Sequence, residues 1–265
     1  MAFHRLPSRV CLSLLIALLP AAAAAHAAGA TLLRTAAQTG TEPKYIAHAK
    51  DGKSAIVGLC VDIDRAIERI EPTLRIVGDQ EWQPTARLEE GMAAGAMDIA
   101  CGLSRNKERE AKFTYIEPPL FPVRYFLVAR ADDNVRIDSW DDVRRLGDNG
   151  VILIPHRFGP IARLKDMGGL TIDSGAPDSK TNLLKLVAGR GRFYYHRSPG
   201  IVSEIRKAGV EDKVKILPTV MDRQLFYMVV GKSVAPDAVE KLQRAIAALE
   251  KSGELKRLID KWNEE

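Results

Sequence analysis

The sequence predicts an α/β fold made of two α/β units, and three patterns lead to this prediction. Short apolar runs alternate with helical patterns, which favours α/β architecture with mostly parallel strands. This alternation occurs in two successive blocks. Two amphipathic helices then end the chain without strands of their own, so their apolar stripes need the first unit as a surface. We therefore expect a discontinuous first lobe and two crossovers between lobes, an arrangement that forms a hinge.

The first 27 residues are predicted to be a secretory signal rather than part of the fold. Arg5 and Arg9 precede an uncharged apolar run of about 16 residues, and an A-x-A pattern follows. Cleavage is expected after Ala27, with Ala30 as the alternative. A retained membrane anchor is the other interpretation, but the run is short of the roughly 20 residues that span a bilayer. The mature protein is thus expected to be soluble and periplasmic.

Charge and cysteine content exclude several classes of function. Without Arg5 and Arg9 the formal net charge of +5 falls to +3, which is too small to indicate a nucleic-acid partner. The sequence has no C-x-x-C motif, His/Cys cluster or Gly-rich phosphate loop, so we predict no metal and no cofactor. Cys60 and Cys101 remain after cleavage. The oxidising compartment permits a bridge between them, and two buried thiols are equally compatible with the sequence.

The first unit follows a β-α-β-α-β pattern. Strands are predicted at 32–37, 74–77 and 97–102, and helices after Gly58 and at 85–94. Gly102 and the residues after it then lie at the carboxyl end of a strand, where open α/β sheets bind ligands.

The second unit and the closing helices follow from similar signals. Ser139 and Asp142 resemble a capping box, and Ser198-Pro199 is predicted to begin a helix as N-cap and first residue. The remaining strands are expected at 125–129, 151–154, 192–195, 214–217 and 226–230, and the helices at 180–187, 236–251 and 253–262.

Five ordered stretches carry a family resemblance over residues 31–265. They are 56–62 (IVGLCVD), 95–99 (GAMDI), 102–114 (GLSRNKEREAKFT), 189–199 (GRGRFYYHRSP) and 252–262 (SGELKRLIDKW). The chain resembles the periplasmic solute-binding proteins of polar amino acid ABC transporters. The resemblance implies the two-lobed periplasmic-binding-protein, or Venus flytrap, fold. It places lobe 1 at 31–123 and 220–265 and lobe 2 at 124–219, with a ligand cleft between the lobes.

The resemblance assigns two residues to a ligand carboxylate, and a glycine close to them allows the ligand to approach. Arg109 matches the family arginine that grips this group with both guanidinium arms, which suits a planar, permanently charged fork. Ser104 matches a hydroxyl that bonds the same carboxylate, and Gly102 allows the backbone to approach the ligand. The alternative is that Arg109 is an ordinary surface arginine in the charged segment 105–109.

Two departures from the family alter the expected ligand. Arg197 stands where the family has an aspartate for the ligand's ammonium group, and an arginine cannot accept a hydrogen bond. Arg157 and Phe158 replace the hydroxyl-bearing turn of lobe 2. Arg109, Arg157 and Arg197 together would suit a ligand with two or more acidic groups. The alternative is that one of these arginines points to solvent or forms a salt bridge across the lobes.

The remaining candidate residues lie near the N-terminal part of lobe 1. Glu42 takes the place of an aromatic residue that stacks on the ligand in the family, in the segment E-P-K-Y that matches "YPPF", and Tyr45 keeps the later ring. Trp82 either lines the cleft or is a half-buried core residue. His156 and His196 fall in turns that face the cleft in the family, and would give pH-sensitive binding if both did so here.

The sequence therefore predicts a monomeric, non-enzymatic binding protein for a small carboxylate-bearing solute, amino acid-like or polyacidic. Its expected partner is an inner-membrane ABC permease. One alternative is a periplasmic enzyme of the cyclohexadienyl dehydratase type, with Glu42 or His196 as the general acid. Another is a ligand-sensing accessory protein.

Overall fold

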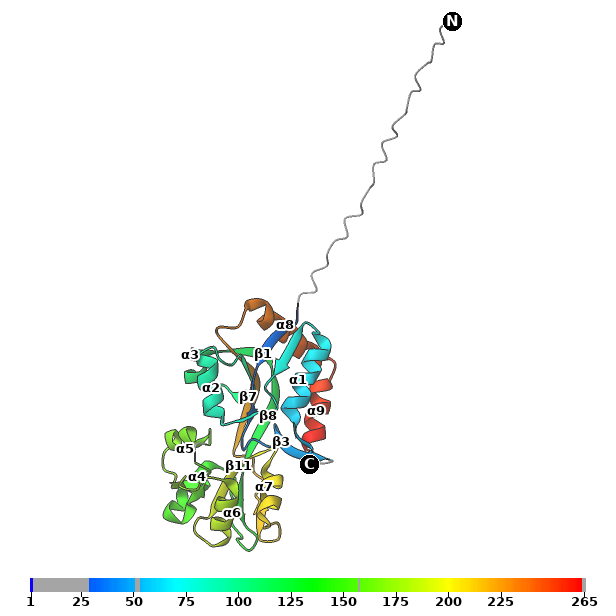
Figure 1. Ribbon diagram of the computed structural model, residues 1–265. Coiled ribbons are helices and arrows are strands. Elements are labelled where there is room, and N and C mark those ends of the chain that lie inside the picture. The colour runs from blue at the N-terminus through cyan, green and yellow to red at the C-terminus, as the bar shows by residue number, and fades with distance from the viewer. Residues whose placement is uncertain (2–28, 51–52, 157, 264–265) are drawn as a thin grey trace.

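The protein has two lobes joined by two long strands (Figure 1). The structure, a computed structural model, describes residues 1, 29–50, 53–156 and 158–263. The predicted signal segment 1–27, apart from Met1, and the predicted ligand residue Arg157 thus lie outside the described residues. Every helix in the described ranges is too short or too polar to cross a bilayer.

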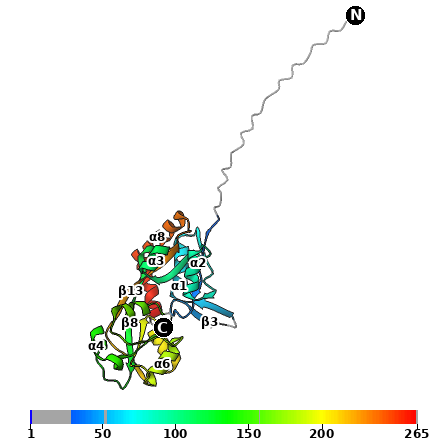
Figure 2. The ribbon, with the colours of Figure 1, turned by 90° about the vertical axis from the view of Figure 1, so that its left-hand side faces the viewer.

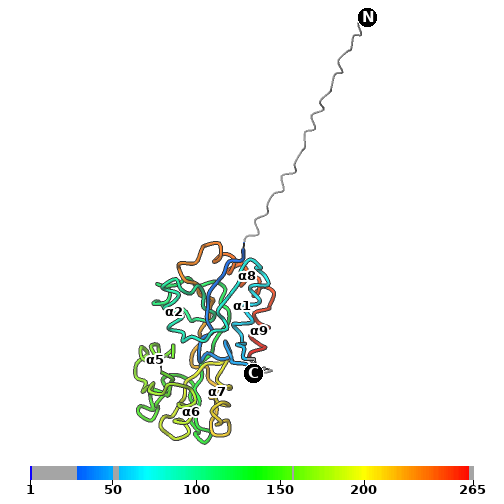
Figure 3. The backbone as a smooth tube through the Cα atoms, viewed as in Figure 1, coloured from blue at the N-terminus to red at the C-terminus, as the bar shows by residue number. Residues whose placement is uncertain are grey.

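Lobe 1 combines the first and last parts of the chain (Figure 3). Its elements are β1 (Thr31–Arg34), β2 (Ala37–Gln38), β3 (Ile46–Lys50), β4 (Lys53–Val57), α1 (Leu59–Ile70), β5 (Leu74–Val77), β6 (Trp82–Gln83), α2 (Thr85–Ala93), β7 (Ile99–Ser104), α3 (Lys107–Lys112), α8 (Pro236–Lys251) and α9 (Glu254–Asn263). β1 pairs in parallel with β5, and β3 and β4 form a hairpin at the side of the lobe (Figure 2). The chain after β1 lies beside β7, because the Gln38 side chain donates to the Cys101 carbonyl at 2.8 Å.

Lobe 2 is a smaller α/β unit. It contains α4 (Trp140–Arg145), a 3-10 turn (Gly147–Gly150), β9 (Ile152–Leu153), α5 (Ile161–Met167), β10 (Ile172–Asp173), α6 (Ser179–Val187), β11 (Phe193–Ser198), α7 (Ile201–Ala208) and β12 (Val214–Ile216). The predicted capping box is confirmed at the start of α4, where the Asp142 carboxylate accepts from the Ser139 amide at 2.7 Å.

Two long strands cross between the lobes. β8 (Phe113–Arg130) pairs with β13 (Asp222–Gly231) along its first part and with β11 and β12 along its last part. β13 returns to lobe 1, where it also pairs with β7. These pairings are antiparallel, whereas the pairs β1–β5, β2–β6, β9–β10 and β9–β11 are parallel. The expectation of mostly parallel strands therefore holds only in part. β8 and β13 run in opposite directions because one leaves lobe 1 and the other returns to it.

The last two helices complete lobe 1. α8 buries Leu242, Ile246 and Leu249, and both α8 and α9 contact α1. In α9, the Trp262 indole N–H donates to the Asp62 carboxylate at 2.8 Å. Burial of these apolar stripes on α1 confirms the predicted discontinuous lobe.

One predicted helix start was wrong. Ser198 is the last residue of β11, paired with Arg124 of β8, rather than a helix N-cap. The chain turns at Gly200, whose φ of 115° lies in a region that favours glycine, and α7 begins at Ile201. Pairing with β8 keeps Ser198 extended, so the helix starts later than its Ser-Pro signal indicates.

A disulfide links the core of lobe 1. Cys60, in the first turn of α1, is bonded to Cys101 of β7, with a Cα–Cα distance of 5.8 Å. Both residues are buried. The structure therefore selects the bridge over the alternative of two buried thiols.

We predict that Cys60→Ala/Cys101→Ala lowers the free energy of unfolding by about 2–4 kcal/mol, because the bridge closes a loop between residues 41 positions apart. Urea denaturation of the oxidised protein and the double variant measures this difference. Reduced wild-type protein is the control and should match the variant. Equal stability of all three samples would contradict the prediction.

Candidate functional site

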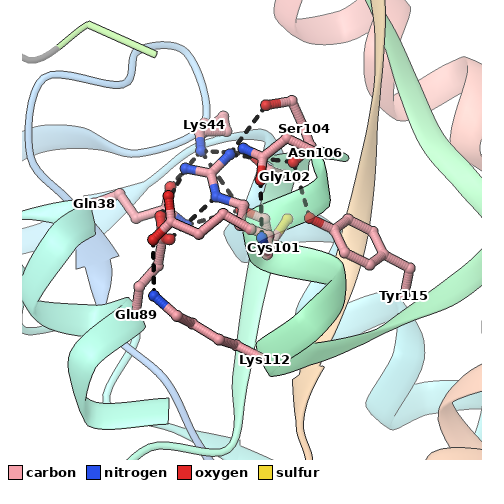
Figure 4. A network of polar contacts seen from close by, with 11 residues as sticks. Gln38, Lys44, Glu89, Cys101, Gly102, Ser104, Asn106, Lys112 and Tyr115 are labelled. Atoms are coloured by element: carbon pink, nitrogen blue, oxygen red, sulfur yellow. Dashed lines mark hydrogen bonds and ion pairs between the residues drawn. The ribbon is translucent and has the colours of Figure 1, made fainter. Parts of the chain in front are cut away.

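Arg109 is held by groups of lobe 1 on both sides of its guanidinium. The Asn106 side chain caps α3 by accepting from the Arg109 amide at 2.8 Å, which places Arg109 in the first turn. Its Nη1 donates to the Ser104 hydroxyl at 3.0 Å, the group that the family resemblance assigns to the ligand's carboxylate. Its Nη2 and Nε donate to the two carboxylate oxygens of Glu89 in α2, at 2.7 and 3.1 Å (Figure 4). The bidentate edge of Arg109 is thus occupied by a carboxylate of the protein itself.

Lys44 is a second basic residue close to the strand that carries Gly102 and Ser104. Its ammonium nitrogen donates to the Gln38 side-chain oxygen and, at 2.9 Å, to the Gly102 carbonyl (Figure 4). The residue is 4% exposed and has no acidic partner among the described residues. Burial, reinforced by the charges of Arg197 and Arg109, holds the pKa of Lys44 well below its ordinary value.

Gly102 is required by this lysine. The φ of Gly102 is +73°, and a Cβ there would lie 2.7 Å from the Lys44 Cδ and 3.0 Å from the Phe121 ring. In the structure it is Lys44 that approaches Gly102 closely, and the predicted approach of a ligand there stays a prediction.

Arg197 is buried without a charged partner. It lies in β11 opposite Tyr125 of β8 and is 6% exposed. Its guanidinium carbon lies 5.3 Å from the centre of the Phe158 ring. Within the described ranges it forms no ion pair and no side-chain hydrogen bond; the charge of Glu204 only attracts it from a distance. Burial lowers the pKa of Arg197, yet a guanidinium keeps its charge at neutral pH.

Glu42 joins the two lobes instead of standing free. Its carboxylate forms an ion pair with Lys207 of α7 and accepts from the Ser203 hydroxyl at 3.4 Å. A Cβ on Gly200 would lie 2.6 Å from the Glu42 carbonyl, so the backbones of the two lobes meet closely here.

The two remaining aromatic candidates are placed differently from each other. Tyr45 is fully buried in the lobe 1 core, where burial and the charge of Asp64 raise the pKa of its hydroxyl well above its usual value. Trp82 is 43% exposed on β6 and is not a core residue. The structure thus brings together Ser104, Gly102 and Arg109, and separately Arg197 and Phe158, and keeps Tyr45 inside lobe 1.

Sequence reasoning missed Lys44 and Glu89. Lys44 occupies the second proline position of the family segment "YPPF", a departure that carried the signal. Glu89 gave no such signal, because its pairing with Arg109 joins side chains of α2 and α3 that lie 20 residues apart in the chain.

His196 is buried between two rings. It stacks on Phe158 at 5.2 Å and on Tyr194 at 5.5 Å, and its Nδ1 lies 3.1 Å from the Arg197 carbonyl. Burial, with a smaller effect of Arg197, lowers its pKa to about 3. His156 is exposed. The two histidines are therefore not a pair poised for pH-sensitive binding near neutrality.

The depressed pKa of His196 predicts a pH-dependent stability. Below its ordinary pKa of 6.5 the unfolded chain takes up a proton that the folded protein refuses until about pH 3. The free energy of unfolding is therefore unaffected by His196 above pH 6.5. Below that pH, His196 lowers it by up to about 1.4 kcal/mol per pH unit. His196→Phe, which keeps the stacking, should remove this part of the loss in denaturation curves between pH 7 and 4. The exposed His48→Gln is the control, and a wild-type pH slope in His196→Phe would refute the assignment.

Comparison with known proteins identifies the family. The sequence model of bacterial extracellular solute-binding proteins, family 3, matches residues 35–265. No curated protein sequence matches the chain significantly.

Three solved structures share the fold. The substrate-binding protein of an amino acid ABC transporter has a TM-score of 0.69 and 17% identity, covering 89% of this chain and all of its own. A Streptococcus pneumoniae amino acid ABC transporter substrate-binding protein bound to L-arginine has a TM-score of 0.68 and 20% identity, covering 88% and 94%. An ancestral amino acid-binding protein, a precursor of cyclohexadienyl dehydratase, has a TM-score of 0.67 and 17% identity, covering 88% and 95%. Since the family model spans nearly the whole described chain, the protein belongs to the bacterial extracellular solute-binding proteins, family 3.

Proposed function

We propose that this protein is exported to the periplasm by its cleaved signal and there captures a small polyacidic solute for uptake through an inner-membrane ABC permease. One observation carries the proposal: Arg197 is buried in β11 of lobe 2, and no acidic side chain among the described residues is bound to it. A buried charge without a partner is destabilising by several kcal/mol, whereas a bound carboxylate restores its hydrogen bonds. Arg197 is therefore the anchor for the solute.

The charges around Arg197 favour an acid over an ordinary α-amino acid. Burial and the charge of Arg197 disfavour the ammonium form of Lys44, and a bound carboxylate close to it would favour that form. The carboxylates of Glu42 and Glu89, by contrast, are already bound to Lys207 and Arg109. Neither of these two is free to hold an ammonium group. A dicarboxylate satisfies both cations and needs no acidic partner.

Arg109 has a changed role in this proposal. The family resemblance assigns it to the ligand's carboxylate, but Glu89 provides that carboxylate here. Arg109, with its charge balanced by Glu89, then supports the site through Ser104, while Arg197 binds the solute.

Binding is coupled to lobe closure. The proposed hinge points are the predicted boundaries 123/124 and 219/220, close to where β8 exchanges its pairing with β13 for pairing with β11. A solute that contacts both lobes binds the closed form better and so increases its population. The Glu42–Lys207 ion pair adds a cross-lobe contact that exists only when the lobes meet.

The dehydratase alternative receives less support from these contacts. Such chemistry needs a general acid near the substrate that is protonated near neutral pH. Of the two residues named for that role, Glu42 is paired with Lys207, and the pKa of His196 is lowered to about 3. A sensing role differs from transport in the partner and not in the solute site.

A thermal-shift panel at pH 7.5 tests the proposal, using C4–C6 dicarboxylates, the common L-amino acids, polyamines and prephenate. A solute at 100 times its Kd adds about 2.7 kcal/mol of stability. We expect dicarboxylates to raise the melting temperature and neutral amino acids to leave it unchanged. Stabilisation by a neutral amino acid alone would overturn the polyacid assignment.

Arg197→Gln separates binding from folding. It should weaken dicarboxylate binding at least about tenfold, because it removes a charge-assisted hydrogen bond. It should also raise the melting temperature of the solute-free protein, since it removes a buried unpaired charge. The control is Arg136→Gln, on an arginine whose side chain is 86% exposed, which should change neither quantity. Unchanged binding in Arg197→Gln would exclude Arg197 as the anchor.

A further inference from the structure

A pocket lies against the crossover strands β8 and β13, and Arg197 is not among its lining residues. Its volume is about 380 Å³, within the range of small-molecule sites. β8 and β13 form its floor, and the apolar side chains of Pro122, Leu225, Pro199 and Ile259 contribute to its lining.

Two arginines meet in this pocket. Arg124 of β8 and Arg223 of β13 are directly opposite in the antiparallel register, and both line the cavity. Both are exposed, and neither forms an ion pair with any described residue. Like charges at directly opposed positions repel each other and destabilise a sheet. An anion between the two guanidinium groups would reverse that repulsion.

The register separates this pocket from the Arg197 site. Tyr125 is paired with both Arg197 and Asp222, and these three residues are buried or partly buried. Arg124 and Arg223 are the adjacent residues on their strands. Because successive side chains on a strand point to opposite faces, the two arginines lie on the other face.

The pocket touches both lobes. Ile259 belongs to α9 of lobe 1, and Pro199 precedes α7 of lobe 2; these helices lie above and below the crossover on the same side of the molecule (Figure 1). A rotation of the lobes about β8 and β13 therefore changes the distance between two of its walls.

We propose that this pocket is a second binding site, for a small amphiphilic monocarboxylate with an aliphatic body. The carboxylate lies between Arg124 and Arg223, where two guanidinium forks are available to it. The aliphatic body lies against Leu225, Pro199 and Ile259, which removes the exposed Leu225 side chain from water. Since the occupant contacts both lobes, it also alters the affinity of the site between the lobes, and the solute there alters its affinity by the same factor.

Octanoate is the test probe, titrated into the mature protein below its micellar concentration and followed by calorimetry. Octanol and octylamine have the same chain without the negative charge. We expect octanoate to bind at least tenfold more tightly than either. Arg124→Gln/Arg223→Gln should lose this preference, whereas Arg197→Gln should keep it. The double variant should fold at least as stably as the wild type, because it removes a like-charge pair.

The outcomes distinguish this proposal from the function of the first site. Loss of octanoate binding in Arg197→Gln, with binding retained in the double variant, would place octanoate in the first site and overturn the second. Equal binding of octanoate and octanol would also overturn it. Failure of every dicarboxylate to bind, with octanoate binding intact, would overturn only the proposed solute.

Discussion

The burial of Arg197 without a counter-ion among the described residues is the constraint on which the rest of the site depends. A guanidinium stays protonated even when it is buried in a region of low dielectric constant. The folded protein therefore bears the cost of desolvating this charge unless a bound anion neutralises it. Pairing with β8 fixes its backbone, and Phe158 covers its guanidinium. Burial and the charge of Arg197 lower the pKa of Lys44, and the charge of Arg109 is offset by its ion pair with Glu89. The fold therefore maintains a positive potential that a small anion would relieve.

The acidic residues around this potential are bound to the protein's own cations. Glu89 binds the two arms of Arg109, and Glu42 crosses between lobes to Lys207. Each pair occupies a residue that the family resemblance assigns to the ligand. The same scaffold can thus change its ligand class without a change of fold, because specificity depends on which charges are left unpaired. The disulfide between α1 and β7 holds the strand that provides Gly102 and Ser104.

Local sequence patterns predicted a helix or strand well where residues inside that element determine its ends. The helix at 236–251 and the strand at 74–77 were predicted at their observed limits, and Ser139 and Asp142 form the expected capping box. The motif register singled out Arg197 and Phe158, which lie together in the structure, and their role in binding a ligand stays a prediction. These local patterns could not predict which strands and side chains pair in the folded protein. Partners distant in the chain determine the antiparallel crossover strands, the extended Ser198 and the Glu89–Arg109 pair. The buried position of Lys44 depends on the absence of a Cβ atom at Gly102.

The central claim is that the solute binds Arg197 while Arg109 stays with Glu89. Nitrogen-15 NMR of the arginine Nε–H groups during titration with succinate, glutarate and adipate tests it most directly, with Arg197→Lys and Arg109→Lys assigning the two signals. The account predicts that at least one of these dicarboxylates moves the Arg197 signal strongly and leaves the Arg109 signal near its solute-free position. A large shift of Arg109 with Arg197 unchanged would mean that the solute displaces Glu89, and would contradict the account.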